Sequence, residues 1–123
     1  PAAARARLAY ADGELLCADD DGQLTCIDLA TGESQVVVRE RQKLRGAVLA
    51  DIVPDSPGLE AATAGYGRRV WIAKRDGDGW QSERLHDEPD RVHHVAAGDL
   101  HSSPGIEFVT AGFTGQLVMY LAR

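Results

Sequence analysis

Short apolar runs alternate with clusters of glycine, aspartate and proline along the whole chain. The runs LLCA at 15–18 and LVMYL at 117–121 are apolar at consecutive positions, and turn residues bound such runs within a few positions. Runs of this length and composition are typical of β-strands rather than helices. A strand that is apolar on both faces is expected to be covered on both. The pattern therefore predicts an all-β protein of packed sheets, with no helix.

Comparison of the chain with itself reveals a repeat. The segment SPGLEAATAGY at 56–66 aligns with SPGIEFVTAGF at 103–113. The match extends on both sides, where 47–52 aligns with 95–100 and 69–72 with 116–119. A weaker first copy, at 13–29, lies about 45 residues upstream, and a period of this length is typical of propellers or solenoids. The sequence therefore contains three copies.

Each copy predicts a four-stranded antiparallel meander. The expected strands are 7–10, 14–19, 23–29 and 35–40 in the first copy; 45–52, 59–65, 69–74 and 81–85 in the second; and 92–100, 107–112 and 116–121 in the third. The segment DGDG at 76–79 supplies a hairpin turn, because glycine reaches the positive φ angles that tight hairpins need. The third copy lacks a fourth strand.

The segments 50–65 and 98–112 resemble the FG-GAP or VCBS type of β-propeller blade, and 20–33 is similar to the PQQ type. The resemblance implies one propeller segment over residues 1–123. Its blades would span about 5–40, 44–86 and 91–123, the last one incomplete.

The loop of the FG-GAP family often binds calcium through alternating aspartate and asparagine side chains. Here Val53 and His101 occupy the alternate positions after Asp51 and Asp99. A hard cation prefers oxygen ligands at such positions. We therefore expect the two aspartates to serve turns, and we expect no bound metal or cofactor.

The number of blades conflicts with ring closure. Propellers typically close with four to eight blades, because an open array exposes its terminal faces and edges. We therefore expect the chain either to pair with the remainder of a longer propeller or to form a homo-oligomer, in which the N-terminal segment of one copy supplies the strand that its partner lacks. The chain begins at Pro1 and its one methionine is Met119, so we expect it to have been cut from a longer one.

Charge and hydropathy exclude two kinds of partner. The net charge is −6 and the pI is near 5.1, so a nucleic-acid backbone would be repelled on average. No apolar run approaches the roughly 18 residues that a membrane span needs. We expect no nucleic-acid partner and no membrane span. The compartment stays open, with an extracytoplasmic one included.

The two cysteines flank a predicted hairpin. A two-residue turn at Asp21 and Gly22 would place Cys17 directly opposite Cys26. Directly opposite cysteines can form a strained cross-strand disulfide. The alternative is a pair of buried free thiols that pack as small hydrophobic groups.

The histidines of the third copy are the main candidates for chemistry. His93, His94 and His101, with Asp99, lie on or just after its first strand, which would line the channel of a propeller. Histidines with a carboxylate can hold zinc or manganese, or act as acid and base. Strand alternation places His93 and Asp99 on one face and His94 on the other. The alternative is a set of histidines that bond to their neighbours.

Tyr66 and Phe113 occupy equivalent repeat positions. They would either stack on a sugar or peptide ligand or pack between neighbouring blades. The charged stretch 39–45 is expected to be a solvated linker between the first two copies.

We find no catalytic constellation in the sequence. The sequence predicts a binding or scaffolding module of a bacterial protein, with a carbohydrate or protein ligand. This prediction rests on analogy with other propellers, since a fold alone does not specify an activity. Two alternatives stay open: a metal-dependent carbohydrate-active enzyme, similar to propeller lyases or hydrolases, that uses the channel histidines; and a structural propeller fragment that assembles with itself.

Overall fold

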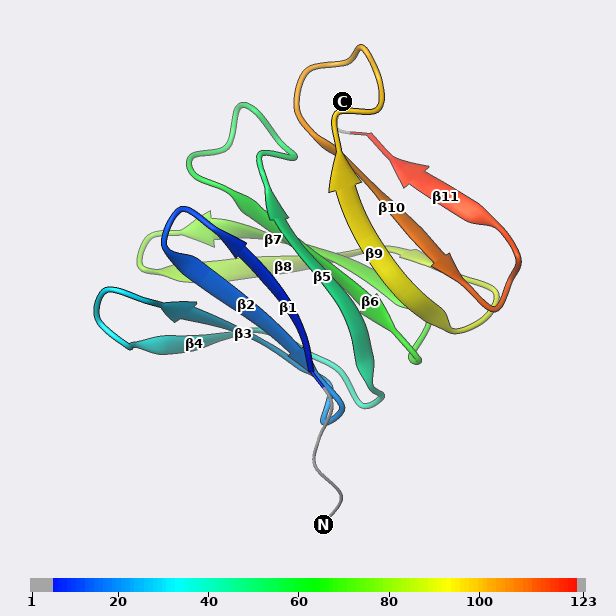
Figure 1. Ribbon diagram of the computed structural model, residues 1–123, viewed down its shortest axis with the longest axis horizontal. Coiled ribbons are helices and arrows are strands. Elements are labelled where there is room, and N and C mark those ends of the chain that lie inside the picture. Colours follow the sequence, from blue (N-terminus) through cyan, green and yellow to red (C-terminus); the bar gives the residue numbers. More distant parts are fainter. Residues whose placement is uncertain (1–5, 122–123) are drawn as a thin grey trace.

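The computed structural model describes residues 6–121 and forms three antiparallel β-sheets (Figure 1). The first sheet contains β1 (Ala6–Ala11), β2 (Glu14–Asp19), β3 (Gln23–Asp28) and β4 (Ser34–Arg39); the second contains β5 (Leu44–Ala50), β6 (Glu60–Gly65), β7 (Arg69–Asp76) and β8 (Gly79–Asp87); the third contains β9 (Val92–Gly98), β10 (Glu107–Gly112) and β11 (Leu117–Tyr120). Each sheet is a meander of sequential strands. The predictions of an all-β fold and of four, four and three strands are confirmed within residues 6–121, where no helix is present. Residues 1–5 and 122–123, which include the predicted ends of the first and third blades, lie outside the described residues.

The second sheet lies between the other two. Every residue of β6 is buried, and so are six of the seven residues of β5. One face packs against the first sheet in a core that includes Leu16, Leu24 and Leu49. The other face packs against the third sheet around Ile72 and Phe108. Apolar residues on both faces of these strands are therefore covered on both sides, as the sequence predicts.

The first strands of the three sheets lie side by side. β1 contacts β5, and β5 contacts β9. All three run in the same direction through the middle of the molecule (Figure 1). Gly46 permits the close approach of β5 to β9, since a Cβ atom there would lie 2.6 Å from the backbone nitrogen of Val95.

Buried glutamates tie the loops and connections to the sheets. The carboxylate of Glu60 accepts a hydrogen bond from Val53 N (2.6 Å), and that of Glu107 accepts bonds from Leu100 N (2.8 Å) and His101 N (2.6 Å). Glu60 and Glu107 occupy equivalent repeat positions, so each holds the loop that precedes its own strand. Satisfying these amides matters because a buried, unpaired N–H group costs about 1–3 kcal/mol.

A second pair of glutamates fixes the connections between sheets. Glu40, between β4 and β5, accepts a bond from Trp71 Nε1 (3.2 Å). Glu88, between β8 and β9, accepts bonds from the hydroxyls of Thr110 (2.7 Å) and Tyr120 (3.1 Å). In both cases the connecting segment bonds to the sheet that follows it.

The predicted pairing of Cys17 with Cys26 is wrong. Cys17 lies opposite Thr25, whereas Cys26 lies opposite Leu16, and both cysteines are free thiols. The β2–β3 loop has three residues rather than two. A two-residue type I′ turn would need a positive φ at both Asp21 and Gly22, whereas Gly22 has a positive φ of 88° and Asp21 does not; the N–H of Gly22 bonds to Asp19 O (3.2 Å). One added loop residue shifts the register by one position, which moves the two side chains to opposite faces of the sheet.

None of the described segments forms a helix long and apolar enough to cross a bilayer. The segment 39–45 is only partly the solvated linker that its charges predict. Residues 41–43 are exposed, but Leu44 and Arg45 begin β5 and are buried.

Candidate functional site

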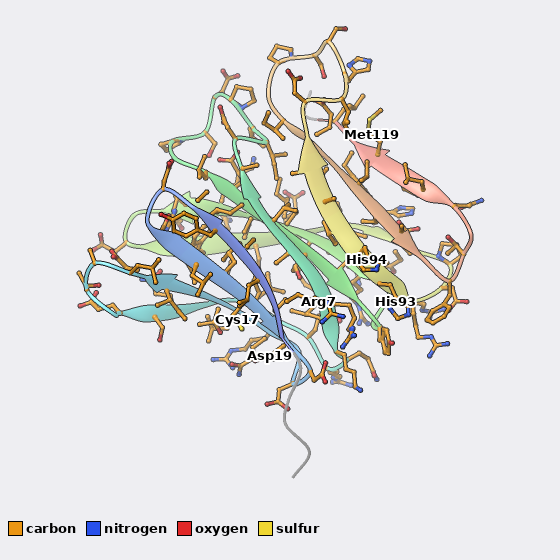
Figure 2. The ribbon with its side chains drawn as sticks, in the orientation of Figure 1. Arg7, Cys17, Asp19, His93, His94 and Met119 are labelled. Atoms are coloured by element: carbon orange, nitrogen blue, oxygen red, sulfur yellow. The ribbon has the colours of Figure 1, made fainter. Side chains whose placement is uncertain are left out.

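Three basic side chains meet where the first strands begin. Arg7 lies near the start of β1, Arg45 near the start of β5 and His93 near the start of β9. Because the three strands are adjacent and run in the same direction, their starts lie at one end of the molecule. Figure 2 shows Arg7, His93 and His94 gathered at this end, with Met119 far away on β11.

Two glycines bring aromatic residues to the same end. Gly65 ends β6 and Gly112 ends β10, and a Cβ atom on either would lie about 2 Å from a carbonyl oxygen, that of Lys43 or Arg91. The following residues then bond to those oxygens: Tyr66 N to Lys43 O (2.8 Å) and Phe113 N to Arg91 O (3.0 Å). The repeat thus sets one aromatic ring beside the start of β5 and another beside the start of β9.

Both aromatic rings contact His93. The imidazole lies edge-on to Tyr66, with ring centroids 5.3 Å apart, and edge-on to Phe113 at 4.3 Å. The Tyr66 hydroxyl also lies 3.5 Å from His93 Nε2. The basic–aromatic cluster is defined here as Arg7, Lys43, Arg45, Tyr66, Arg91, His93, His94 and Phe113.

Cations surround the two rings. The guanidinium carbon atoms of Arg45 and Arg91 lie 5.7 and 5.3 Å from the centroid of Tyr66, and Lys43 Nζ lies 6.0 Å from it. Arg91 also lies 4.3 Å from the centroid of Phe113. Distances up to about 6 Å are typical of cation–π contacts. The arrangement concentrates positive charge on a chain whose net charge is −6.

Arg45 is the most enclosed cation of the cluster. Its side chain is only 8% exposed and forms an ion pair with Asp20 (Nη1 to Oδ1, 2.9 Å). Its Nε atom is buried and has no hydrogen-bond partner among the described residues. A buried donor of this kind is normally satisfied, so an unpaired one calls for an explanation.

The same charges act on His93. Its pKa lies below the usual value, first because of desolvation and then because of the positive charges of Arg45, His94, Arg91 and Arg7. His93 is therefore predominantly neutral at pH 7. Protonation would add another positive charge to the cluster, and a bound anion would favour that protonation.

The structure separates the predicted site residues into two groups. Tyr66, His93 and Phe113 come together, and the His94 ring lies 6.3 Å from that of His93. His101 and Asp99 lie in the loop after the other end of β9, where His101 Nδ1 bonds to the backbone and hydroxyl of Ser103. The four histidine and aspartate candidates therefore do not form one site.

The cations of the cluster were missed by the reasoning from sequence. Lys43 and Arg91 are equivalent repeat positions, as are Arg45 and His93, so the alignment carried the signal. Within residues 6–121, no group of three or more His, Cys, Asp or Glu side chains could hold a metal ion. No family model matches this chain, and no curated protein matches it at a significant level.

Proposed function

We propose that the three sheets are blades of a β-propeller and that the chain is a binding module, which takes an anionic ligand at the basic–aromatic cluster. Support for the propeller arrangement comes from the face-to-face stacking of the sheets and from the adjacent first strands, which would line the centre of a ring. The resemblance of the repeats to FG-GAP and VCBS blades agrees with it.

One observation carries the binding function: Arg45 is a nearly buried cation with an unpaired Nε donor, among other cations and two aromatic rings. Charge-assisted hydrogen bonds to a carboxylate, sulfate or phosphate would satisfy this donor. Phe113 is half exposed and offers an apolar surface beside the charges. An acidic sugar combines both chemistries, since one side of such a ring is apolar and a carboxylate lies at its edge.

The test is a titration followed by NMR, with sodium glucuronate and, separately, potassium phosphate at constant ionic strength. We expect saturable shifts at Arg91 and His93, and glucuronate binding that tightens as the pH falls below 6.5, because His93 gains a proton while the carboxylate keeps its charge. Glucuronate binding that exceeds phosphate binding would identify the apolar contribution. Binding of phosphate but not of glucuronate would count against the acidic sugar. The absence of a saturable shift with either compound would count against the whole proposal.

Two exposed arginines provide a matched pair of variants. Arg91 in the cluster and Arg84 on β8 are each about half exposed, and each lies near one aspartate at 3.7–3.8 Å. We expect Arg91→Gln to weaken binding several-fold and Arg84→Gln to leave it unchanged, because interactions of exposed charges are screened over about 10 Å. Equal effects of the two substitutions would mean that the anion is attracted by general charge and not by the cluster.

A second candidate, self-assembly into a ring, is favoured by a different observation. Val48, Ala62, Ala64, Val70 and Ile72 form the buried face of the second sheet that meets the third. Their repeat equivalents are Ala96, Val109, Ala111, Leu117 and Met119, which pair in the same register on the outer face of the third sheet. There Leu117 is 70% exposed.

The outer face of the first sheet is also apolar, with Leu8 and Tyr10 both about two-thirds exposed. Each open face therefore has a complementary face at the other end of the same stack, and two copies would form six blades. We expect light scattering to give the mass of a dimer, and Leu117→Lys to give a monomer. A wild-type monomer with one cooperative melting transition would refute self-assembly and leave ligand binding untouched.

The metal-dependent enzyme is not proposed, since no observation favours it. His101 is distant from His93 and His94, and the described residues contain no cluster that could hold a metal.

A further inference from the structure

A mostly apolar cavity lies between the outer strands of the second and third sheets. It has a volume of about 440 Å³ and is open on one side. Its apolar lining comes from Ile72 and Leu85 of the second sheet and from Phe108, Val118, Tyr120 and Leu121 of the third. A volume of this size is typical of cavities that hold a ligand.

The third sheet ends at this cavity. The first and second sheets have four strands each, whereas the third has three, so β11 has no neighbour on its outer side among the described residues. An unpaired strand edge presents a row of free N–H and C=O groups. The cavity and this edge are therefore adjacent parts of one surface.

The interface between the first and second sheets indicates what belongs there. In that interface the fourth strands β4 and β8 contact each other, and Gln35 Nε2 donates to Asp78 O (2.5 Å). Trp80, on β8, packs against the core of the first sheet. At the next interface no described strand takes the place of β8, and the cavity occupies the space where such a side chain would pack.

We propose that the edge of β11 and the adjacent cavity bind an extended strand, which pairs antiparallel with β11 and inserts a large apolar side chain into the cavity. The occupant is a segment of a separate partner polypeptide with the chemistry of β8, namely an alternating strand with an aromatic residue on its inward face; the remaining residues of this chain, PAAAR at 1–5 and AR at 122–123, contain no aromatic residue. Every strand within 6–121 is already paired in its own sheet, so a second copy offers none of them. Backbone bonds would supply affinity and the inserted side chain would supply specificity.

The proposal is tested with a synthetic peptide that copies residues 78–88, DGWQSERLHDE, which contain β8. The matched control is the same peptide with Trp80→Ser. We expect saturable binding of the first peptide, slower hydrogen exchange at β11 (Leu117–Tyr120), and an affinity at least about tenfold higher than that of the control, because the control buries no indole. Failure to slow exchange at β11, or equal affinities of the two peptides, would overturn the proposal.

Variants of the protein test the position of the strand. Leu85 lines the cavity and is 42% exposed, whereas Leu29, which is 52% exposed, follows β3 and lies outside the cavity. We expect Leu85→Glu to abolish binding of the peptide and Leu29→Glu to leave it unchanged. If the unliganded protein were instead a dimer that Leu85→Glu dissociates, a second copy would occupy the cavity and the proposal would be wrong. The basic–aromatic cluster takes no part in these outcomes, so they are independent of anion binding.

Discussion

Substitution of Gly46 by alanine tests whether the first strands of the second and third sheets pack as closely as the structure indicates. A Cβ atom at this position would lie 2.6 Å from Val95 N and 2.9 Å from Val95 Cγ2. The nearer atom belongs to the backbone, so β9 must move as a unit to relieve the contact. Overpacking of this kind costs about 1–3 kcal/mol.

The substitution also has a favourable effect on stability. Replacing a strand glycine by alanine gains about 0.5–1 kcal/mol, because it reduces the freedom of the unfolded chain. We therefore expect Gly46→Ala to lower the free energy of unfolding by about 1–2 kcal/mol. Urea unfolding, followed by tryptophan fluorescence, measures this difference.

Gly79 supplies the matched control. It begins β8, has no positive φ, and a Cβ atom there would lie 3.7 Å from its nearest neighbour, Asp76 O. We expect Gly79→Ala to leave the free energy of unfolding unchanged or to raise it by up to about 1 kcal/mol. If Gly46→Ala behaved like Gly79→Ala, β5 and β9 would not be in close contact, and the central arrangement of first strands would be refuted.

Two further predictions concern buried ionisable groups. Glu60→Ala should cost about 1–3 kcal/mol in unfolding free energy, since it leaves Val53 N without its acceptor. Glu60→Gln keeps an acceptor and should cost less. Desolvation raises the pKa of Glu60, with a smaller contribution from Asp51. The wild type should therefore gain stability relative to Glu60→Gln as the pH falls through the folded pKa toward 4.5. Parallel stability–pH curves for the two proteins would contradict this. The second prediction concerns the thiols. Desolvation and Glu14 raise the pKa of Cys26 to about 11, and desolvation raises that of Cys17. Because the thiolate is the reactive form, iodoacetamide at pH 8 should alkylate the folded protein much more slowly than the unfolded one. Mass spectrometry measures the rates, and formation of a Cys17–Cys26 disulfide in the folded protein would show that the register is wrong.

The sequence was sufficient to predict the strands, because most are short apolar runs between turn residues and the repeat supports the spacing of the others, such as the mostly polar β8. It failed at Cys17 and Cys26, where the result depends on one backbone detail. A two-residue and a three-residue loop both use Gly22, and composition does not distinguish them. The backbone of Asp21, which lacks the positive φ that a two-residue type I′ turn needs, decides the register and hence the face on which each thiol lies.

The candidate site was predicted only in part for a related reason. Tyr66, Phe113 and His93 stood out as unusual residues, whereas Arg45 was grouped with a charged linker because its neighbours are charged. What sets Arg45 apart is that it follows the first buried residue of β5 and pairs with Asp20, which lies in the loop between β2 and β3 of the first sheet. A contact between residues 25 positions apart depends on how the sheets stack, which a local pattern does not specify.

Repeat equivalence has a consequence for how this stack functions. Glu60 and Glu107 both have a structural role, since each accepts hydrogen bonds from the loop before its own strand. Gly65 and Gly112 also have a structural role, because each lets the end of a strand pass close to a carbonyl oxygen. The positions that begin the first strands differ instead: the second sheet has arginine where the third has histidine. The scaffold residues Glu and Gly are thus kept between copies, whereas the cluster combines positions of the same type, Lys43 with Arg91 and Tyr66 with Phe113, with this position that differs. This difference agrees with the proposed binding surface, because a ligand that contacts several strand starts together can use a different group from each.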